Sequence, residues 1–257
     1  MRLTVVGCAG SFPGPTSPAS CYLLESDGFR LVIDMGNGSL GALQRYTGLF
    51  DIDAVCLSHL HADHCTDLYS YQIARQIAPD GPQPPIPVYG PGGTAERIAM
   101  IHGPGGDDEL SKRFTYSALS PGAVDIGPFR VTTDHMNHPV ETFGFRIEQG
   151  GQAITYSADT GESEALVELA RGADVLLAEA SFLDGPELPR NLHLTATQAG
   201  EHAQRAGVGE LVLTHMVAWN DPLRSVADAR DSFGGTVTTA EAGLVIDFDE
   251  DRSDRDR

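Results

Sequence analysis

Six consecutive residues of this chain are rich in side chains that bind metal ions, and they constrain the fold more than any other segment. They are His59, Leu60, His61, Ala62, Asp63 and His64, and they follow an apolar run at residues 54–57. Imidazole nitrogen and carboxylate oxygen are preferred ligands of zinc and related metals. In an extended segment His59 and His61 point to one side, whereas Asp63 and His64 begin a turn. The spacing predicts a site that can serve two metal ions; the alternative is a surface loop that binds none.

The length and the even spread of apolar runs predict one folded domain. A chain of 257 residues with 41% hydrophobic residues can bury a large core, and no linker-like segment divides it. We expect this domain at residues 1–248. Residues 249–257 contain acidic and basic side chains without apolar ones, which predicts a disordered acidic tail.

The charge of the chain argues against a long nucleic acid as a partner. It has 17 Lys and Arg residues against 36 Asp and Glu residues, which gives a formal net charge of -19. Binding to a phosphate backbone requires clustered cations that displace its counterions. We therefore expect a small-molecule substrate.

The N-terminus and the cysteines favour a cytoplasmic protein. Residues 1–7 enter a strand pattern directly, without the charged and apolar regions of a secretion signal. The longest apolar runs have the length of strands, so we expect no membrane span. Cys8, Cys21, Cys56 and Cys65 lack paired spacing, which is typical of reduced thiols. Cys65 follows His64 directly, and it either binds metal or packs beneath the loop.

Strand-like and helical segments alternate in two similar halves of the chain. In the first half we expect strands at 3–6, 21–24, 31–33, 54–57 and 88–89, and helices at 66–77 and 92–101. In the second half we expect strands at 129–133, 142–147, 153–156, 175–177, 211–213 and 244–246, and helices at 163–171, 195–206 and 221–233. This order predicts the α/β class, as an αββα sandwich of two central mixed β-sheets flanked by helices.

Three further metal-binding side chains follow predicted strands of the second half. They are His138, Asp159 and His215. Loops at strand ends are where a rigid scaffold presents functional groups. Each of these residues alone is also compatible with a structural polar role, but their occurrence together with residues 59–64 favours a metal-binding role.

In order and spacing, these residues resemble the metallo-β-lactamase superfamily. The matching pieces are residues 58–64, His138, residues 157–161 and residues 213–215, which span nearly the whole chain. The resemblance implies a metallo-β-lactamase fold with two divalent metal ions, with zinc as the first expectation and manganese or iron as alternatives. It implies His59, His61 and His138 as ligands of one ion, Asp63, His64 and His215 as ligands of the other, and Asp159 as the bridge. His135 is a rival for the place of His138.

Within the superfamily, the chain is similar to the branch of ribonuclease Z and the compact cyclic nucleotide phosphodiesterases. Residues 7–11, 159–161, 179–181 and 193–196 carry this similarity. It implies a phosphodiester substrate, with Asp63 orienting or deprotonating the attacking water. His193 then donates a proton to the leaving oxygen and is held by Glu179. Alternatively, His193 is a polar residue beside the start of the helix at 195–206.

Two departures distinguish the chain from ribonuclease Z. That family has a long basic arm between its third histidine and its bridging aspartate, whereas about twenty residues separate His138 from Asp159 here, enough for a hairpin with a turn at residues 149–151. The family also has a histidine where this chain has Ala178. We therefore expect hydrolysis of 3′,5′-cyclic AMP or a related cyclic nucleotide. The alternatives are a ribonuclease Z-like tRNA 3′-processing endonuclease and, from another class, a non-catalytic metal-bound sensor or scaffold.

The resemblance also suggests roles for residues outside the ligand set. Asp67 either caps the helix that follows it or holds the ring of His59 or His61. The branch commonly forms homodimers, which makes a homodimer one expectation. Candidates for contacts to the base are Ser11, Phe12, Tyr22, Tyr69, His102, Phe182 and Trp219, each of which has a place in the core as its alternative.

Overall fold

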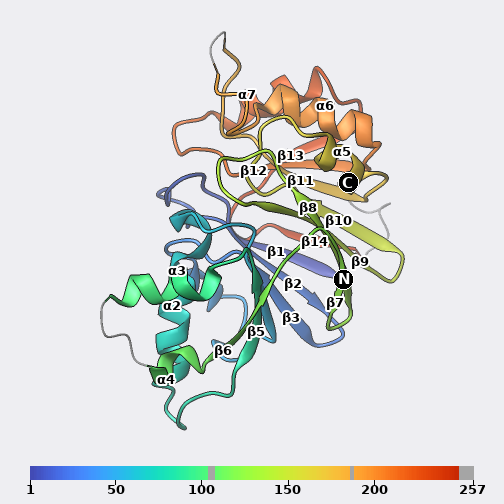
Figure 1. Cartoon of the computed structure of the whole chain (residues 1–257). Coiled ribbons are helices and arrows are strands. Elements are labelled where there is room, and N and C mark those ends of the chain that lie inside the picture. The colour runs from blue at the N-terminus through green and yellow to red at the C-terminus, as the bar shows by residue number, and fades with distance from the viewer. Residues whose placement is uncertain (104–107, 186–187, 249–257) are drawn as a thin grey trace.

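A computed structural model describes residues 1–103, 108–185 and 188–248, and in this part of the chain two β-sheets lie face to face with helices on their outer sides (Figure 1). The expected αββα sandwich is confirmed. The extent of the domain, predicted as residues 1–248, stays a prediction. The predicted acidic tail at residues 249–257 lies outside the described residues.

The first sheet comes mainly from the first half of the chain. Among the described residues it contains, in spatial order, the seven strands β14 (Val245–Asp247), β1 (Arg2–Gly7), β2 (Cys21–Ser26), β3 (Phe29–Ile33), β4 (Ala54–Cys56), β5 (Ile86–Gly90) and β6 (Phe114–Ala118). The pairings from β14 to β3 are antiparallel, and those from β3 to β6 are parallel. The sheet is therefore mixed, as expected.

The second sheet repeats this arrangement with strands from the second half. The described part contains, in spatial order, the seven strands β7 (Gly122–Ile126), β8 (Phe129–His135), β9 (Phe143–Gln149), β10 (Gln152–Tyr156), β11 (Val175–Glu179), β12 (Glu210–Thr214) and β13 (Thr236–Thr239). The pairings from β7 to β10 are antiparallel, and those from β10 to β13 are parallel. The two halves of the chain thus build the same order of pairings.

Each sheet has its own helices. The first sheet is accompanied by α1 (Ser39–Leu43), α2 (Ala62–Gln76), α3 (Thr94–His102) and α4 (Asp108–Ser111), and the second by α5 (Glu164–Ala170), α6 (Ala196–Ala206) and α7 (Pro222–Arg230) (Figure 1). No helix among the described residues combines the length and the apolar character needed to cross a membrane.

Buried side chains fill three layers. Tyr22 and Phe145 belong to the layer between the sheets. Leu68 of α2 packs in the layer outside the first sheet, and Ala199 of α6 in the layer outside the second. Because strands in the middle of each sheet are covered on both faces, they consist of nearly continuous apolar runs, which is what made them recognisable in the sequence.

Several elements differ from the sequence-based expectation. Helix α2 begins at Ala62 rather than at residue 66, because His61 has the extended backbone of an N-cap residue (φ -68°, ψ 153°). Asp63 then lies in the first helical turn, where a carboxylate is favoured by the helix dipole. Helices α1 and α4 and strands β6, β7 and β13 were not expected. They are short, and β7 and β13 are edge strands with few buried positions.

Candidate metal centre

The seven side chains predicted as metal ligands converge at one edge of the two sheets. They come from the loop between β4 and α2, from the first turn of α2, and from the segments that follow β8, β10 and β12. They form two groups that share one aspartate: His59, His61, His138 and Asp159, and Asp63, His64, Asp159 and His215. Within each group the candidate ligand atoms all lie within 4.8 Å of one another.

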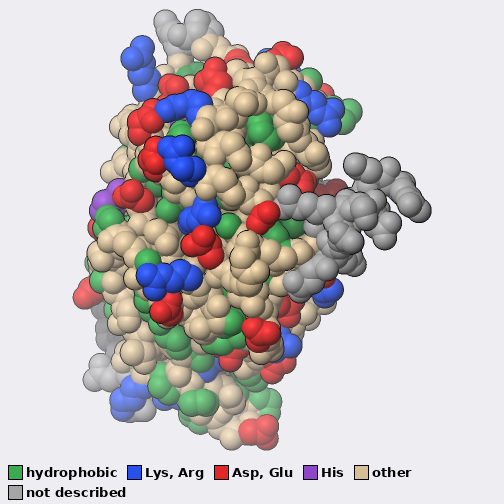
Figure 2. Space-filling model, turned by 90° about the vertical axis from the view of Figure 1, so that its right-hand side faces the viewer, with side chains coloured by type: hydrophobic (Ala, Val, Ile, Leu, Met, Phe, Trp, Pro, Cys, Tyr) green, Lys and Arg blue, Asp and Glu red, His purple; other side chains and the backbone are tan. Residues whose placement is uncertain are grey.

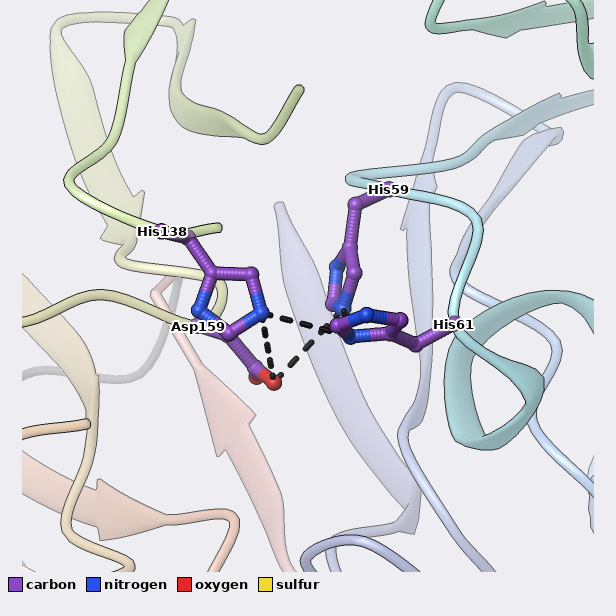
Figure 3. Close-up of side chains that lie close together, drawn as sticks. All are labelled: His59, His61, His138 and Asp159. Atoms are coloured by element: carbon purple, nitrogen blue, oxygen red, sulfur yellow. Dashed lines mark hydrogen bonds and ion pairs between the residues drawn. The ribbon is translucent and has the colours of Figure 1, made fainter. Parts of the chain in front are cut away.

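The first group consists of three imidazoles arranged around one carboxylate oxygen (Figure 3). His61 Nδ1 is 3.1 Å from His59 Nε2 and 3.2 Å from His138 Nε2. Asp159 Oδ2 is 3.6 Å from His59 Nε2 and 3.9 Å from His138 Nε2. The side chains of His59, His138 and Asp159 are buried, whereas His61 is half-buried.

The second group is buried throughout. His215 Nε2 lies 3.1 Å from Asp63 Oδ2 and 3.2 Å from His64 Nε2. Asp159 Oδ1 lies 3.2 Å from His64 Nε2 and 3.4 Å from His215 Nε2. All four side chains are buried.

Asp159 divides its two carboxylate oxygens between the groups. Oδ2 faces the first group, and Oδ1 faces the second. Oδ1 is buried and accepts no well-formed hydrogen bond from the described residues. A buried carboxylate oxygen without a donor is costly unless a cation approaches it.

The surroundings determine which nitrogen of each imidazole faces the centre. His138 Nδ1 is 2.9 Å from the carbonyl oxygen of Leu192, which only accepts a hydrogen bond, so Nδ1 carries the proton. Ser58 Oγ donates to Asp34 and therefore accepts from His59 Nδ1 at 3.0 Å. In both rings Nε2 is left as a lone pair directed at the first group.

The same reasoning applies to the second group. His64 Nδ1 donates to Asp34 Oδ2 at 2.8 Å. Ser181 Oγ donates to the carbonyl oxygen of His215 and accepts from His215 Nδ1 at 2.8 Å. Metal-binding histidines commonly donate their second nitrogen to a carboxylate or a carbonyl in this way.

These residues fit divalent metal ions. Two unprotonated Nε2 atoms 3.2 Å apart, as in His64 and His215, repel each other unless a cation lies between them. Four ligand atoms at zinc-ligand distances around a tetrahedral ion are separated by roughly 3.3 Å, which agrees with the spacings in both groups. The centre is therefore a metal-binding cluster of the dinuclear kind, held by histidine and aspartate side chains.

Electrostatics favour a cation in the second group. Burial disfavours a charged His64, but the carboxylates of Asp159 and Asp34 outweigh it and raise the pKa of His64 well above its usual value. Burial also opposes ionisation of Asp159, yet His215 and His64 lower its pKa well below the ordinary range. A metal ion competes with protons for such ligands.

Asp34 is a supporting residue that sequence reasoning missed. It directly follows β3 and is fully buried, and its carboxylate accepts hydrogen bonds from Ser58 N, Ser58 Oγ, His64 Nδ1 and Tyr156 OH at 2.7 to 3.0 Å. It thereby fixes the rings of both His59, through Ser58, and His64. An aspartate immediately after a buried strand was the available signal.

Strained backbone is concentrated around the centre. Among the described residues, five non-glycine residues have positive φ, and four of them flank the centre: Ser11, Asp34, Ala158 and His215, with φ of 62°, 58°, 52° and 54°. Such conformations persist only where the surrounding structure determines them, and they are frequent at functional sites.

Glu179 and His193, the predicted catalytic pair, lie in contact beside the centre. His193 Nδ1 is 2.9 Å from Glu179 Oε1 and 4.0 Å from Asp159 Oδ2. Burial disfavours a charged His193, but the hydrogen bond and the charge of Glu179 outweigh it and raise the pKa of His193. Glu179 is fully buried, which raises its own pKa, and its Oε1 also accepts from the backbone N–H of Thr160, next to Asp159. The pair is therefore anchored to the loop that carries Asp159.

The structure assigns positions to three residues whose roles the sequence left open. Asp67 neither caps α2 nor holds a histidine: its Oδ2 accepts from the backbone of Leu40 at 2.9 Å, so it caps the neighbouring helix α1. Cys65 packs in the core outside the first sheet and does not bind metal with the described groups. His135 is exposed and lies outside both ligand groups, which leaves His138 in the first group.

The candidates for base contacts fall into two sets. Ser11, Phe12, Phe182 and Trp219 line a pocket of about 480 Å³ together with Ser181, Leu183, Leu192, His193, Val217 and Asn220. The other three candidates do not line it. Tyr22 is buried, with its OH 2.7 Å from Thr214 Oγ1, and the OH of Tyr69 lies 2.9 Å from Nδ1 of His102.

The chain matches a family model, described as the beta-lactamase superfamily domain, over residues 30–216. It is 42% identical over 253 residues to an uncharacterized protein of Mycobacterium leprae, covering 96% of this chain and 89% of that protein. It is 32% identical over 254 residues to the probable metallo-hydrolase YhfI of Bacillus subtilis, covering 95% and 99%. It is also 33% identical over 244 residues to a ribonuclease Z of Mycolicibacterium paratuberculosis, covering 84% and 86%.

Solved structures agree with the match to the beta-lactamase superfamily. The crystal structure of the metallo-beta-lactamase fold protein YhfI from Bacillus subtilis superimposes with a TM-score of 0.85 at 30% identity, covering 95% of this chain and 98% of YhfI. The short form of human tRNase Z superimposes with a TM-score of 0.77 at 22% identity, covering 97% and 100%, which supports the fold alone. The expected metallo-β-lactamase fold is confirmed.

Proposed function

Because the chain belongs to the beta-lactamase superfamily and is a metal-dependent hydrolase, we propose that it is a dinuclear phosphodiesterase that hydrolyses a small phosphodiester, specifically 3′,5′-cyclic AMP or a related cyclic nucleotide. We assign His59, His61 and His138 to one metal ion, Asp63, His64 and His215 to the other, and Asp159 to both.

The observation that carries the proposal is the position of His193. Its Nδ1 is bound to Glu179, it lies 4.0 Å from the shared carboxylate of Asp159, and its side chain also lines the pocket beside the centre. A phosphodiester held at the centre, with its organic part in the pocket, has its leaving oxygen next to this imidazole. A protonated histidine in that position is suited to general acid catalysis.

The chemistry divides between these residues. Two divalent ions, when bound, would activate a water and neutralise charge on the phosphate. Asp63 orients this water or accepts one of its protons as its oxygen forms the new bond to phosphorus. His193 gives its proton to the ribose oxygen as the old phosphorus–oxygen bond breaks. Glu179 stabilises the charged imidazole before transfer and fixes its orientation. The product is a nucleoside monophosphate.

Zinc is the metal that we propose for both positions. The candidate ligands are imidazole nitrogens and carboxylate oxygens, which zinc accepts readily, while all four cysteines are free and buried outside the ligand groups. Manganese and iron remain the alternatives, because the same ligands accept them and affinity order alone does not choose among them.

The pocket supports a small substrate. Its volume of about 480 Å³ lies in the range of pockets for small ligands. Among the described residues, no Lys or Arg lines it, so it offers no partner for the further phosphates of a long chain.

A ribonuclease Z-like endonuclease is the second candidate, because the chain is 33% identical to a ribonuclease Z. The segment between His138 and Asp159, however, contains the hairpin of β9 and β10 with Gly150 and Gly151 in its turn, and no arm. Many arginines are paired with acidic residues: Arg30, Arg130, Arg146, Arg171, Arg205 and Arg224. On the face shown in Figure 2, Lys and Arg side chains are interspersed with Asp and Glu. This distribution disfavours the grip on an RNA backbone.

Hydrolysis assays test the proposal directly. The metal-loaded protein should hydrolyse bis-para-nitrophenyl phosphate and cyclic AMP, and should lose both activities after treatment with a chelator. A 3′-extended tRNA precursor, assayed in parallel, should remain uncleaved. Cleavage of the tRNA precursor without turnover of cyclic AMP would reverse the order of the two candidates.

Two accompanying expectations are also part of the proposal. The four free cysteines are compatible with the cytoplasmic location expected from the sequence. A homodimer is expected from the resemblance, and sedimentation of the purified protein tests it.

A further inference from the structure

The pocket adjoins the candidate centre. His193 and Ser181 both belong to its wall, and Ser181 Oγ lies 2.8 Å from Nδ1 of the ligand residue His215. A substrate bound at the centre can therefore place its organic part in this pocket. The chemistry of the pocket wall then determines which organic group of a substrate the pocket accepts.

Apart from His193, the pocket wall is uncharged, and much of it is aromatic. Among the described residues, no Lys, Arg, Asp or Glu lines it, whereas Phe12, Phe182 and Trp219 do. Flat apolar surfaces of this kind favour a flat ring over a flexible or charged group. Ser11 and Asn220 add polar side chains that can contact the edge of such a ring.

Two of these rings are unusually exposed. Trp219 is 74% exposed and Phe12 is 38% exposed, and their ring centroids are 5.4 Å apart. Of the large hydrophobic side chains that are exposed in the described part of the chain, these are the two aromatic ones. A pair of exposed aromatic rings at the mouth of a pocket leaves a surface on which a ligand can stack.

The backbone holds both rings in a fixed relation to the centre. Trp219 lies four residues after the ligand residue His215, and Asn220 Nδ2 donates to the carbonyl oxygen of Ser181 at 3.0 Å. The loop that carries Phe12 approaches the same segment so closely that a Cβ atom on Gly10 would lie 2.2 Å from the carbonyl oxygen of His215. Only glycine fits at residue 10, which explains how the Phe12 loop reaches the pocket.

We propose that Phe12, Phe182 and Trp219 form a subsite for the heteroaromatic base of a nucleotide. Because Phe12 and Trp219 already touch each other, the base stacks against this pair from the pocket side rather than between them. The ribose then lies near His193, and the phosphodiester lies at the centre. The inference rests on the proposed function and specifies which part of the substrate the pocket recognises.

Trp219 provides a direct binding assay because the chain contains one tryptophan. Intrinsic fluorescence of the metal-loaded protein is titrated with 5′-AMP and, in parallel, with ribose 5-phosphate, which carries a phosphate but no base. We expect saturable quenching with 5′-AMP and little change with ribose 5-phosphate. Equal responses to the two compounds, or no response to 5′-AMP, would overturn the subsite.

Kinetics on substituted proteins provide the second test. Trp219→Ala should raise the KM for cyclic AMP by about 5- to 150-fold, the range that corresponds to the loss of one base–aromatic stack. The KM for glycerol 1,2-cyclic phosphate, which has no base, should not change. Trp219→Phe should restore most of the affinity. Leu223→Ala is the matched control, since Leu223 is 80% exposed, lies close to Trp219 in sequence and does not line the pocket.

These outcomes separate the subsite from the proposed function. Quenching by 5′-AMP without any hydrolysis of cyclic AMP would support the base subsite and contradict the cyclic nucleotide phosphodiesterase. Hydrolysis of cyclic AMP with an unchanged KM in Trp219→Ala would support the phosphodiesterase and overturn the subsite.

Discussion

The two ligand groups of the centre differ in how firmly the surrounding protein holds them. In the second group all ligands are buried, and Asp34 and Ser181 orient the rings of His64 and His215. In the first group His61 is half-buried, His138 is oriented by a backbone carbonyl, and His59 is oriented by Ser58. The second group is therefore the more preorganised metal site, and the first is the more open one.

This difference suggests a division of labour. A buried site with oriented rings loses little conformational freedom when it binds an ion, so it should retain its metal more tightly. A half-buried site leaves room for substrate and water to approach. Substitutions and metal titrations can test whether the two groups are unequal in this sense.

Removal of the shared ligand should have the largest effect. Asp159→Ala removes the carboxylate from both groups, and activity on bis-para-nitrophenyl phosphate should fall by at least about 10⁴-fold, because charge stabilisation and activation of the nucleophile are lost together. Metal analysis should find fewer than two ions per chain. Asp80→Ala, at an exposed position in a turn, is the control. Retention of two tightly bound ions would show that Asp159 is not shared.

Removal of the proposed proton donor should have the next largest effect on activity. It should not weaken metal binding in either ligand group. His193 contacts His138 and His215 at similar centroid distances of 5.7 and 5.5 Å. His193→Ala should lower kcat for cyclic AMP by about 10²–10⁴-fold, the usual scale of general acid catalysis, while metal content stays unchanged. A substrate whose leaving group needs no proton, such as bis-para-nitrophenyl phosphate, should lose much less. An equal loss on both substrates would contradict the role of proton donor.

Substitution of Asp34 should weaken the second group more than the first, because Asp34 contacts His64 directly but reaches His59 only through Ser58. Asp34→Asn weakens the hydrogen bond that orients His64, so affinity for the second ion should fall by about 10- to 100-fold, the usual effect of such outer partners. Titration with a competing chelator measures both affinities. Ser181→Ala, which removes the partner of His215, should weaken the same ion. If the first ion were lost preferentially in both variants, the proposed assignment of supporting residues would be wrong.

The smallest expected effect is a difference in metal affinity between the two sites of the unaltered protein. During stepwise chelation the half-buried first group should release its ion before the second, with affinities that differ by about tenfold or more. Metal content measured against chelator concentration should therefore fall in two steps. A single step that removes both ions together would contradict the comparison.

The sequence was most informative where neighbours in the chain are also neighbours in space. Residues 59–64 and the ends of buried strands could be recognised because local spacing and apolar runs determine them. Asp34 could not be assigned a partner, because its contacts to His64 and Tyr156 join residues 30 and 122 positions apart. Asp67 was misjudged for the same reason, since it caps a helix that precedes it by more than twenty residues.

Exposure to solvent explains the remaining differences between the sequence-based expectations and the structure. Strands β7 and β13 lie at the edge of the second sheet and bury few side chains, so they lack the apolar runs that identified β1 and β11. The aromatic candidates could not be sorted by sequence, because a pocket wall and a core both favour aromatic residues. Only the folded chain separates Trp219, which is exposed at the pocket, from Tyr22, which is buried.

The pairing of β14 with β1 has a consequence for how the protein is made. The strand at residues 245–247 completes the first sheet by pairing with residues 2–4, with Leu3 opposite Ile246. During synthesis β1 therefore keeps one row of backbone groups unpaired until residues 245–247 have left the ribosome. An open strand edge of this kind readily pairs with other chains. Strand β14 thus covers an edge of β1 that would otherwise be open to pairing with other chains.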